Sequence, residues 1–201
     1  TGTWIDKISL KTFLEAVPEQ ILVVVDEAYF EYAIDQPDYP NCLEWISTYP
    51  NLIVTRTFSK AYGLAGLRIG YAISHPDVAN LLNRVRQPFN VNSLALVAAT
   101  AALTDTEHLN QSIVLNREGM QQLTQAFDDI KLPYIKSACN FISVEVGDGE
   151  KVYRDLLYEG IIVRPIGGGY QMPRHIRVTV GLDEENFLLI EALKKILDRQ
   201  L

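Results

Sequence analysis

Apolar runs in the first part of the chain predict the strands of a sheet. Residues 21–25 (ILVVV) form a continuous run, and such runs are typical of strands that are buried on both faces of a parallel sheet. Residues 51–55 and 68–73 form two further runs of this kind. Helical patterns are expected at residues 10–16 and 42–48. This alternation of strands and helices predicts an α/β layer architecture.

The pattern becomes helical after the third run. Three helices are expected there, at residues 77–86, 93–103 and about 106–129. The segment 87–90 (QPFN) interrupts this series, and its proline disfavours the helical conformation. We therefore expect a domain boundary at this break, with residues 1–87 in a first domain and 88–201 in a second.

Strands and helices are mixed in the expected second domain. Residues 140–146 alternate like a half-buried strand, and residues 161–165 and 175–180 are typical of short strands. A helix is expected at residues 151–159, and Asp183 is expected to cap a final amphipathic helix. These elements predict an α+β unit.

Composition and charge narrow the class of protein. The formal net charge is -7, whereas nucleic-acid-binding proteins usually carry a basic stripe. The run 93–103 is too short and too rich in alanine to span a bilayer. Cys42 and Cys139 match no metal-ligand spacing and are expected to be reduced thiols. We expect a cytoplasmic protein that binds neither nucleic acid nor a membrane and holds no metal.

The segment 57–70 (TFSKAYGLAGLRIG) places Lys60 in a cluster of hydroxyls and glycines. A loop lysine is most often solvated. Here, however, Thr57 and Ser59 offer hydroxyl groups, and Arg68 supplies a planar cation that is suited to a phosphate. A lysine beside such a cluster favours a Schiff base with a phosphorylated aldehyde cofactor, pyridoxal phosphate.

This cofactor needs an acidic partner for its pyridine nitrogen. Asp26 follows the first apolar run, and ligands of open α/β sheets bind at the carboxyl ends of strands. Tyr29 could donate to the cofactor's phenolate oxygen. Alone, the segment 26–29 is more often a strand end with a capping aspartate, but together with the lysine cluster it favours cofactor binding. Glu27 and His75 are expected to be structural.

Several short motifs occur in order along the chain. They are DEAY at residues 26–29, SK at 59–60, AGLR at 65–68 followed by Gly70, VRQPFNVN at 85–92 and IRVTVG at 176–181. On these motifs the sequence resembles the fold-type I pyridoxal-phosphate aminotransferases, and within them the histidinol-phosphate aminotransferases. The resemblance covers essentially all 201 residues. It implies part of a large domain with a mainly parallel sheet, followed by a small C-terminal α+β domain.

The resemblance also implies roles for individual residues. Lys60 would carry the cofactor, Asp26 would pair with the pyridine nitrogen, and Tyr29 would contact the O3′ oxygen. A second set of three would hold the cofactor's phosphate: Thr57, Ser59 and Arg68.

The same resemblance implies a substrate-binding role for two arginines in the expected second domain. From the sequence alone, a strand arginine is about as often an exposed residue at the edge of a sheet, with its guanidinium in water, as a residue that binds a ligand. In the resembled family, the arginines that correspond to Arg164 and Arg177 bind anionic groups of the substrates, and Arg177 is the stronger of the two candidates.

The activity that the resemblance implies is amino transfer between histidinol phosphate and 2-oxoglutarate, a step of histidine biosynthesis, in a cytoplasmic homodimer. About the first half of the family's subunit precedes the matching part, so the chain is expected to be a truncated fragment. Two alternatives stay open. One is a related enzyme of the same fold, an aromatic-amino-acid aminotransferase or an amino-acid-phosphate decarboxylase. The other is a folded fragment without catalytic activity.

Overall fold

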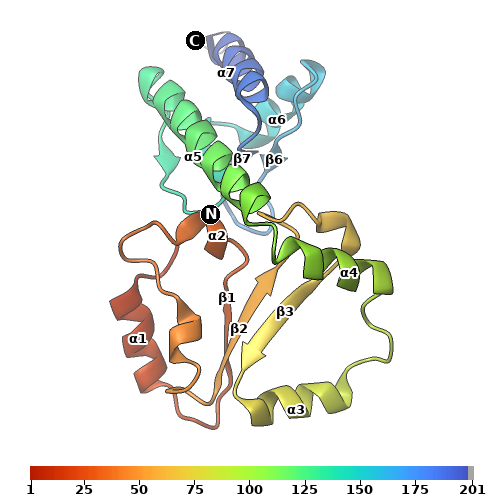
Figure 1. Cartoon of the computed structure of the whole chain (residues 1–201). Coiled ribbons are helices and arrows are strands. Elements are labelled where there is room, and N and C mark those ends of the chain that lie inside the picture. Colours follow the sequence, from red (N-terminus) through yellow and green to blue (C-terminus); the bar gives the residue numbers. More distant parts are fainter. Residues whose placement is uncertain (199–201) are drawn as a thin grey trace. The chain divides into compact units, whose positions relative to one another are not determined.

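A computed structural model describes residues 1–198 of the chain (Figure 1). It divides into two compact units, one of which is Ile5–Ile113 and the other Thr1–Trp4 together with the chain from Val114 onward. The division falls within helix α5 (Thr106–Asp129). The two compact units are separated at a different point from the domain boundary that we expect between residues 87 and 88. A division into compact units does not test that boundary, so it stays a prediction.

A three-stranded sheet forms the centre of the unit Ile5–Ile113. Strand β1 (Val23–Asp26) pairs in parallel with β2 (Leu52–Thr57), and β2 pairs with β3 (Gly70–Ser74) in antiparallel direction. The α/β class is confirmed, and each of the three apolar runs contributes a strand. The third strand does not continue the parallel arrangement. A parallel return needs a long crossover, usually a helix, and the segment between β2 and β3 holds only the 3-10 helix η2 (Ala65–Leu67).

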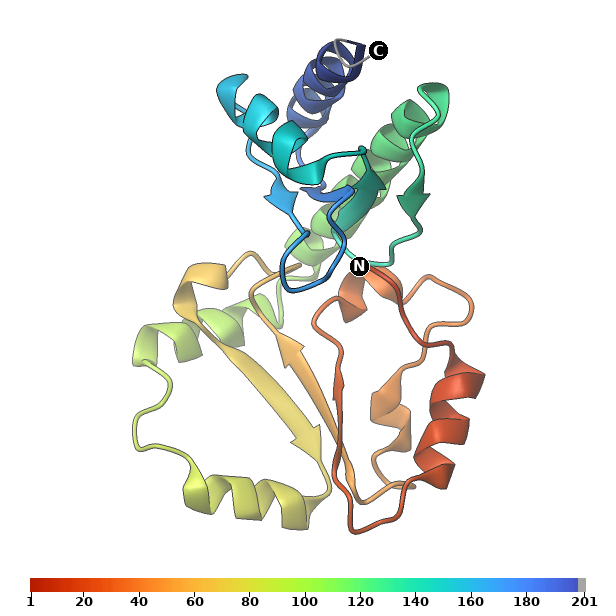
Figure 2. The ribbon, with the colours of Figure 1, turned by 180° about the vertical axis from the view of Figure 1, so that it is seen from behind.

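Short helices surround this sheet. They are α1 (Lys7–Ala16), α2 (Phe30–Ala33), the 3-10 helix η1 (Cys42–Trp45), α3 (Pro76–Val85) and α4 (Ser93–Ala102). In both Figure 1 and Figure 2, α1 and η1 lie on the β1 side of the sheet and α3 and α4 on the β3 side. Helix α1 begins three residues earlier than expected because the Asp6 carboxylate accepts hydrogen bonds from the backbone N–H groups of Ile8 and Ser9.

One face of the sheet is buried, and the other is exposed at β1. Leu52 and Val54 of β2 pack against Leu10 of α1 and Trp45 of η1. By contrast, Val24 of β1 is 60% exposed. Side chains alternate between the faces of a strand, so the expectation of burial on both faces is wrong for β1.

The second unit combines a four-stranded antiparallel sheet with helices. Its strands are β4 (Tyr134–Ile135), β5 (Phe141–Glu145), β6 (Arg164–Pro165) and β7 (His175–Thr179), in the order β4-β5-β7-β6. Its helices are α6 (Gly149–Tyr158), α7 (Asp183–Asp198) and the later part of α5. The expected α+β organisation is confirmed.

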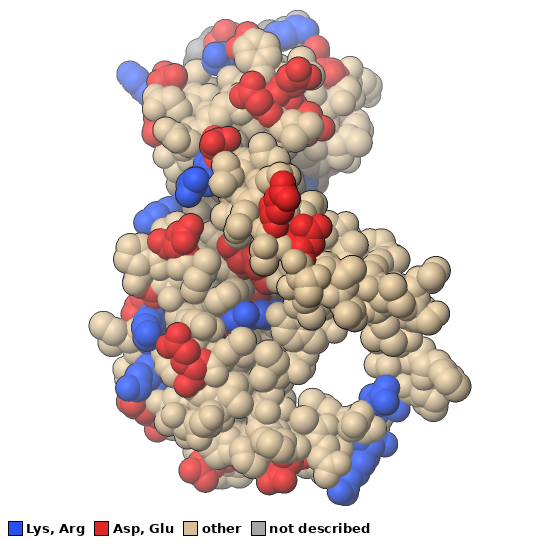
Figure 3. Space-filling model, in the orientation of Figure 1, with Lys and Arg blue, Asp and Glu red and all other residues tan. Residues whose placement is uncertain are grey.

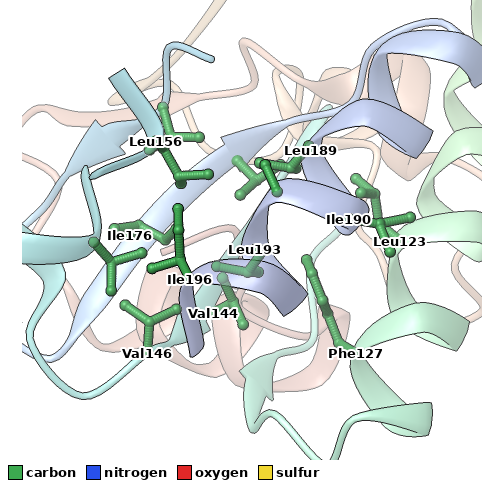
Figure 4. Close-up of a cluster of buried hydrophobic side chains, with 14 of the residues drawn as sticks. Leu123, Phe127, Val144, Val146, Leu156, Ile176, Leu189, Ile190, Leu193 and Ile196 are labelled. Atoms are coloured by element: carbon green, nitrogen blue, oxygen red, sulfur yellow. The ribbon is translucent and has the colours of Figure 1, made fainter. Parts of the chain in front are cut away.

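The core of this second unit joins helices α5, α6 and α7 to the sheet (Figure 4). Ile176 of β7, Leu156 of α6 and Leu193 of α7 are all fully buried there. Asp183 was expected to cap α7, but it is the first residue of the helix. The Glu185 carboxylate accepts a 2.8 Å hydrogen bond from the N–H of Leu182 instead, as the third helical residue does in a capping box.

Charged side chains of both signs are scattered over the visible face in Figure 3, where helix α4 forms a stretch of uncharged surface. Among residues 1–198, no helix combines the length and the apolar character that a bilayer crossing needs.

The core of the second unit gives a stability prediction. Leu193→Ala removes a fully buried side chain, so it should lower the free energy of unfolding by about 2–5 kcal/mol. Leu188→Ala is the matched control, because Leu188 lies on the same helix but is 61% exposed. Urea unfolding followed by circular dichroism measures both. Equal losses in the two variants would contradict the placement of the core.

Candidate functional site

Two parallel strands end at one edge of the sheet in the unit Ile5–Ile113. Asp26, the last residue of β1, is paired with Thr55 of β2. The Asp26 carboxylate accepts hydrogen bonds from the Thr55 hydroxyl at 3.3 Å and from the N–H of Ala28 at 3.1 Å. These two contacts fix an exposed carboxylate at the carboxyl end of its strand, the position at which open α/β sheets bind ligands.

A closed loop follows β2 and carries Lys60. The Thr57 hydroxyl accepts a 3.0 Å hydrogen bond from the N–H of Ser59, and the Lys60 carbonyl accepts one of 2.9 Å from the N–H of Gly63. Gly63 has a φ of 71°, a conformation that glycine adopts without strain. Phe58 is buried and packs with residues of α4 and β3. The loop is therefore held at its base, with Lys60 at the turn.

The structure brings Lys60 and Tyr29 together. The Lys60 Nζ atom lies 5.4 Å from the centroid of the Tyr29 ring, within the range of a cation–π contact. The two residues are far apart in sequence and lie on loops that follow the neighbouring strands β1 and β2. The amine and the phenol are thus neighbours at the edge where Asp26 ends its strand.

Arg68 lies on the returning side of the same loop. The N–H of Phe58 donates a 3.2 Å hydrogen bond to the Ile69 carbonyl, so Ser59 and Arg68 are the next residues on the two sides of that bond. Arg68 has a left-handed backbone with φ of 53°, and its Nη1 donates to the Ala65 carbonyl at 2.9 Å. Its side chain is exposed.

A buried ion pair lies behind these residues. Glu27 Oε2 accepts hydrogen bonds from Arg56 Nε at 3.0 Å and Nη2 at 2.8 Å, and Glu27 Oε1 accepts one of 2.9 Å from the N–H of Cys42. The Arg56 guanidinium carbon is 3.5 Å from the centroid of the Phe30 ring. Glu27 is buried and paired, and the expectation that it is structural stays a prediction. Arg56 was missed by the sequence analysis, although an arginine directly after an apolar run is a usable signal of a buried partner.

The other pair of expected site residues lies in the second unit. Arg164 of β6 and Arg177 of β7 are direct cross-strand partners, and Ser143 of β5 pairs with Arg177 on its other side. Directly opposed residues share a face of the sheet, and Ile176 and Val178, the neighbours of Arg177, are in the core. The two guanidinium groups therefore belong to the face away from the core.

Arg177 is the more confined of the two. Its guanidinium carbon lies 4.4 Å from the centroid of the Phe141 ring, and among the described residues its Nε finds no hydrogen-bond acceptor. Like charges placed directly opposite each other destabilise a sheet. An anion bound between Arg164 and Arg177 would offset that repulsion and accept the unused hydrogen bond.

Sequence comparison identifies the family. The family model described as "Aminotransferase class I and II" matches residues 1–193. The chain belongs to this family. Over 199 residues it is 58% identical to "Histidinol-phosphate aminotransferase 1" of Nitrosococcus oceani, covering 98% of this chain and 53% of the relative. It is 54% identical to the protein of the same name from Idiomarina loihiensis, with the same coverage.

Solved structures of aminotransferases share this fold. The histidinol-phosphate aminotransferase of Sinorhizobium meliloti, solved in complex with pyridoxal-5'-phosphate, matches with a TM-score of 0.88 and 33% identity over 100% of this chain and 55% of that one. The L-threonine-O-3-phosphate decarboxylase of Porphyromonas gingivalis, at 21% identity and a TM-score of 0.83, shares the fold alone. The chain spans about half the length of the curated relatives it matches.

Two further residues of the chain, His75 and Cys42, are explained by local structure. His75 caps α3 through its Nδ1 atom, which accepts from the N–H of Asp77 at 3.4 Å, so it is structural as expected. Burial, followed by the charge of Glu27, raises the pKa of the Cys42 thiol. A protonated thiol is a poor nucleophile, so Cys42 belongs to the packing.

Glu31 of α2 is a second buried carboxylate of the chain. Burial, opposed in part by a backbone hydrogen bond and by the charge of Arg56, raises the pKa of its side chain. A carboxyl group with a raised pKa stabilises the folded state below its unfolded pKa, and that contribution is lost as the pH rises through the folded pKa. At neutral pH, therefore, the charge of Glu31 costs stability.

This gives a prediction with a sign. Glu31→Gln should raise the free energy of unfolding at pH 7 relative to the unchanged protein, and the gain should shrink as the pH falls toward 4. Urea unfolding at a series of pH values measures it. The control is Glu19→Gln, which replaces an exposed glutamate and should change stability by less than about 0.5 kcal/mol. A gain from Glu31→Gln that stays constant with pH would rule out the raised pKa.

Proposed function

We propose that Lys60 carries pyridoxal phosphate and that the protein transfers amino groups between histidinol phosphate and 2-oxoglutarate. The observation that carries the proposal is the contact between Lys60 and Tyr29. The Lys60 Nζ atom lies 5.4 Å from the centroid of the Tyr29 ring, and both residues follow strands at the edge of the sheet where Asp26 ends β1. The relatives named histidinol-phosphate aminotransferase support the choice of substrates. A cytoplasmic homodimer is part of the same proposal, because the sequence resemblance implies it.

The groups gathered at this edge fit the chemistry of the cofactor. A primary amine, a phenol and a fixed carboxylate come from Lys60, Tyr29 and Asp26. The loop after β2 adds donors for a phosphate, from the Thr57 and Ser59 hydroxyls to the exposed Arg68. When bound, pyridoxal phosphate supplies a ring that takes up the electron pair of the substrate's α-carbon.

Each residue then has a defined task. Lys60 would hold the cofactor covalently, and its amine, when free, would move the proton of the substrate's α-carbon. Asp26 keeps the proton on the pyridine nitrogen, and its bonds from Thr55 and Ala28 hold the carboxylate in place. Tyr29 would donate a hydrogen bond from its hydroxyl group to the O3′ oxygen of the cofactor. The hydroxyls and Arg68 bind the phosphate with charge-assisted hydrogen bonds.

Arg164 and Arg177 have the task of binding an anionic group of the substrate. Two arginines at directly opposed positions on one face of a sheet match a phosphate or a carboxylate, because such a group can accept hydrogen bonds from a planar guanidinium fork. This is the chemical feature that would favour a phosphorylated amine over an uncharged one.

The covalent link gives a direct test. Lys60→Ala should abolish the visible absorbance that pyridoxal phosphate acquires on the protein, because only a primary amine at this position can bind it. Borohydride reduction of the unchanged protein, followed by peptide mass mapping, should place the cofactor on the peptide that contains Lys60. Lys7→Ala, which removes an exposed lysine, is the control and should keep the absorbance. A Lys60→Ala spectrum like that of the unchanged protein would refute the assignment.

Substrate choice is tested through the paired arginines. Arg177→Gln and Arg164→Gln should each raise KM for histidinol phosphate about tenfold or more, since a hydrogen bond to a charged group is worth about 1.5–3 kcal/mol. The control is Arg174→Gln, because Arg174 is exposed and pairs with Glu145 at 2.6 Å.

The same assay separates the alternatives. Faster turnover of phenylalanine or of threonine phosphate than of histidinol phosphate would favour the aromatic-amino-acid aminotransferase or the decarboxylase. No turnover of any of them, with no cofactor bound, would favour a non-catalytic folded chain.

A further inference from the structure

The Glu27–Arg56 ion pair occupies a special place relative to the candidate site. Glu27 directly follows Asp26, and Arg56 directly precedes Thr57. Their side chains are only 2% and 10% exposed. Because neighbouring side chains of a strand leave on opposite sides, the pair lies behind the sheet edge whose open side carries Asp26 and Thr57.

Three elements hold this pair in one geometry. The guanidinium of β2 donates two hydrogen bonds to a single carboxylate oxygen of Glu27, and the other oxygen accepts the N–H of Cys42 in η1. The Arg56 Nη2 also donates to Asn41 Oδ1 at 3.1 Å. The Phe30 ring lies 3.5 Å from the guanidinium carbon and belongs to the residue after Tyr29. The pair thus connects β2 with the chain that follows β1.

Stability alone is a weak reason for such an arrangement. Taking two charges out of water costs several kcal/mol per ion, and well-packed apolar residues often serve stability equally well. What apolar packing does not supply is direction, because the bidentate fork of an arginine fixes both distance and angle. A buried pair at this position is therefore suited to fixing one strand end against the next.

We propose that the Glu27–Arg56 ion pair is the positioning element of the cofactor site. It sets Asp26 and Tyr29, on the chain after β1, against Thr57 and Lys60, on the chain after β2. Neither member of the pair touches the cofactor. The inference rests on the proposed function, because only a bound cofactor would require the carboxylate, the phenol and the amine to be held at fixed separations.

The test uses the protein at its native length and three variants. Glu27→Gln keeps an acceptor for the Cys42 N–H but leaves the Arg56 charge without its partner. Glu27→Gln combined with Arg56→Met removes both charges and keeps that acceptor. Glu31→Gln is the matched control, since it neutralises another buried carboxylate four residues away. The measurements are the melting temperature without cofactor, Kd for pyridoxal phosphate, and the pH midpoint of the visible absorbance of the lysine-bound cofactor.

If the Glu27–Arg56 ion pair positions the cofactor site, the variants should behave differently than if the pair only stabilises the fold. Glu27→Gln should lower the melting temperature, raise Kd about tenfold or more, as loss of a supporting contact does at metal sites, and shift the pH midpoint. The double variant should regain the melting temperature, because no buried charge is left unpaired, while Kd and the midpoint stay altered. Glu31→Gln should keep Kd within about twofold and the pH midpoint within about 0.2 units of the unchanged protein, because it leaves the hydrogen bonds between Arg56 and Glu27 in place.

Two outcomes count against the inference and are distinguishable. If Kd and the midpoint return to their normal values in the double variant together with the melting temperature, the pair is structural only and the proposed function stands. If the unchanged protein itself gains no visible absorbance with pyridoxal phosphate, the proposed function fails and the inference fails with it.

Discussion

Parallel pairing of β1 with β2 brings the carboxyl ends of two strands to one edge, and every part of the candidate site in this unit depends on that register. Asp26 stands opposite Thr55, and the N–H of Glu27 continues the ladder with a 2.9 Å bond to the Thr55 carbonyl. Side chains alternate, so Asp26 faces the open side while Glu27 enters the interior beside Arg56. A slip of one residue would exchange these two carboxylates, placing a buried acid where an exposed one is needed.

The same alternation organises the second unit. Ile176 and Val178 of β7 belong to the core, whereas Arg177 between them faces the other way, beside Arg164. The hydrophobic face provides the stability that keeps these two arginines at opposed positions of neighbouring strands. One strand therefore contributes both to the packing of α6 and α7 and to a surface suited to an anion.

Several features could be predicted from local pattern. The three apolar runs are strands, the long helix Thr106–Asp129 has the expected bounds, and the chain from residue 57 to 70 forms a closed loop around Lys60. Other features could not. β3 runs antiparallel to β2, because direction depends on the connection and not on the strand's own residues. Val24 is exposed although its run is wholly apolar, because a run of this kind does not reveal whether a second layer covers it.

The sequence by itself determined the chemical types at the site: a lysine among hydroxyls, an acid after an apolar strand, and two strand arginines whose motifs match an aminotransferase family. These follow from residue identity and spacing. Only the tertiary structure decided that Lys60 lies beside Tyr29, that Arg56 pairs with Glu27, and that Arg164 stands opposite Arg177. Each of these contacts joins residues of different loops or strands. Strand register and chain direction create such contacts, and both are set by packing across the whole unit.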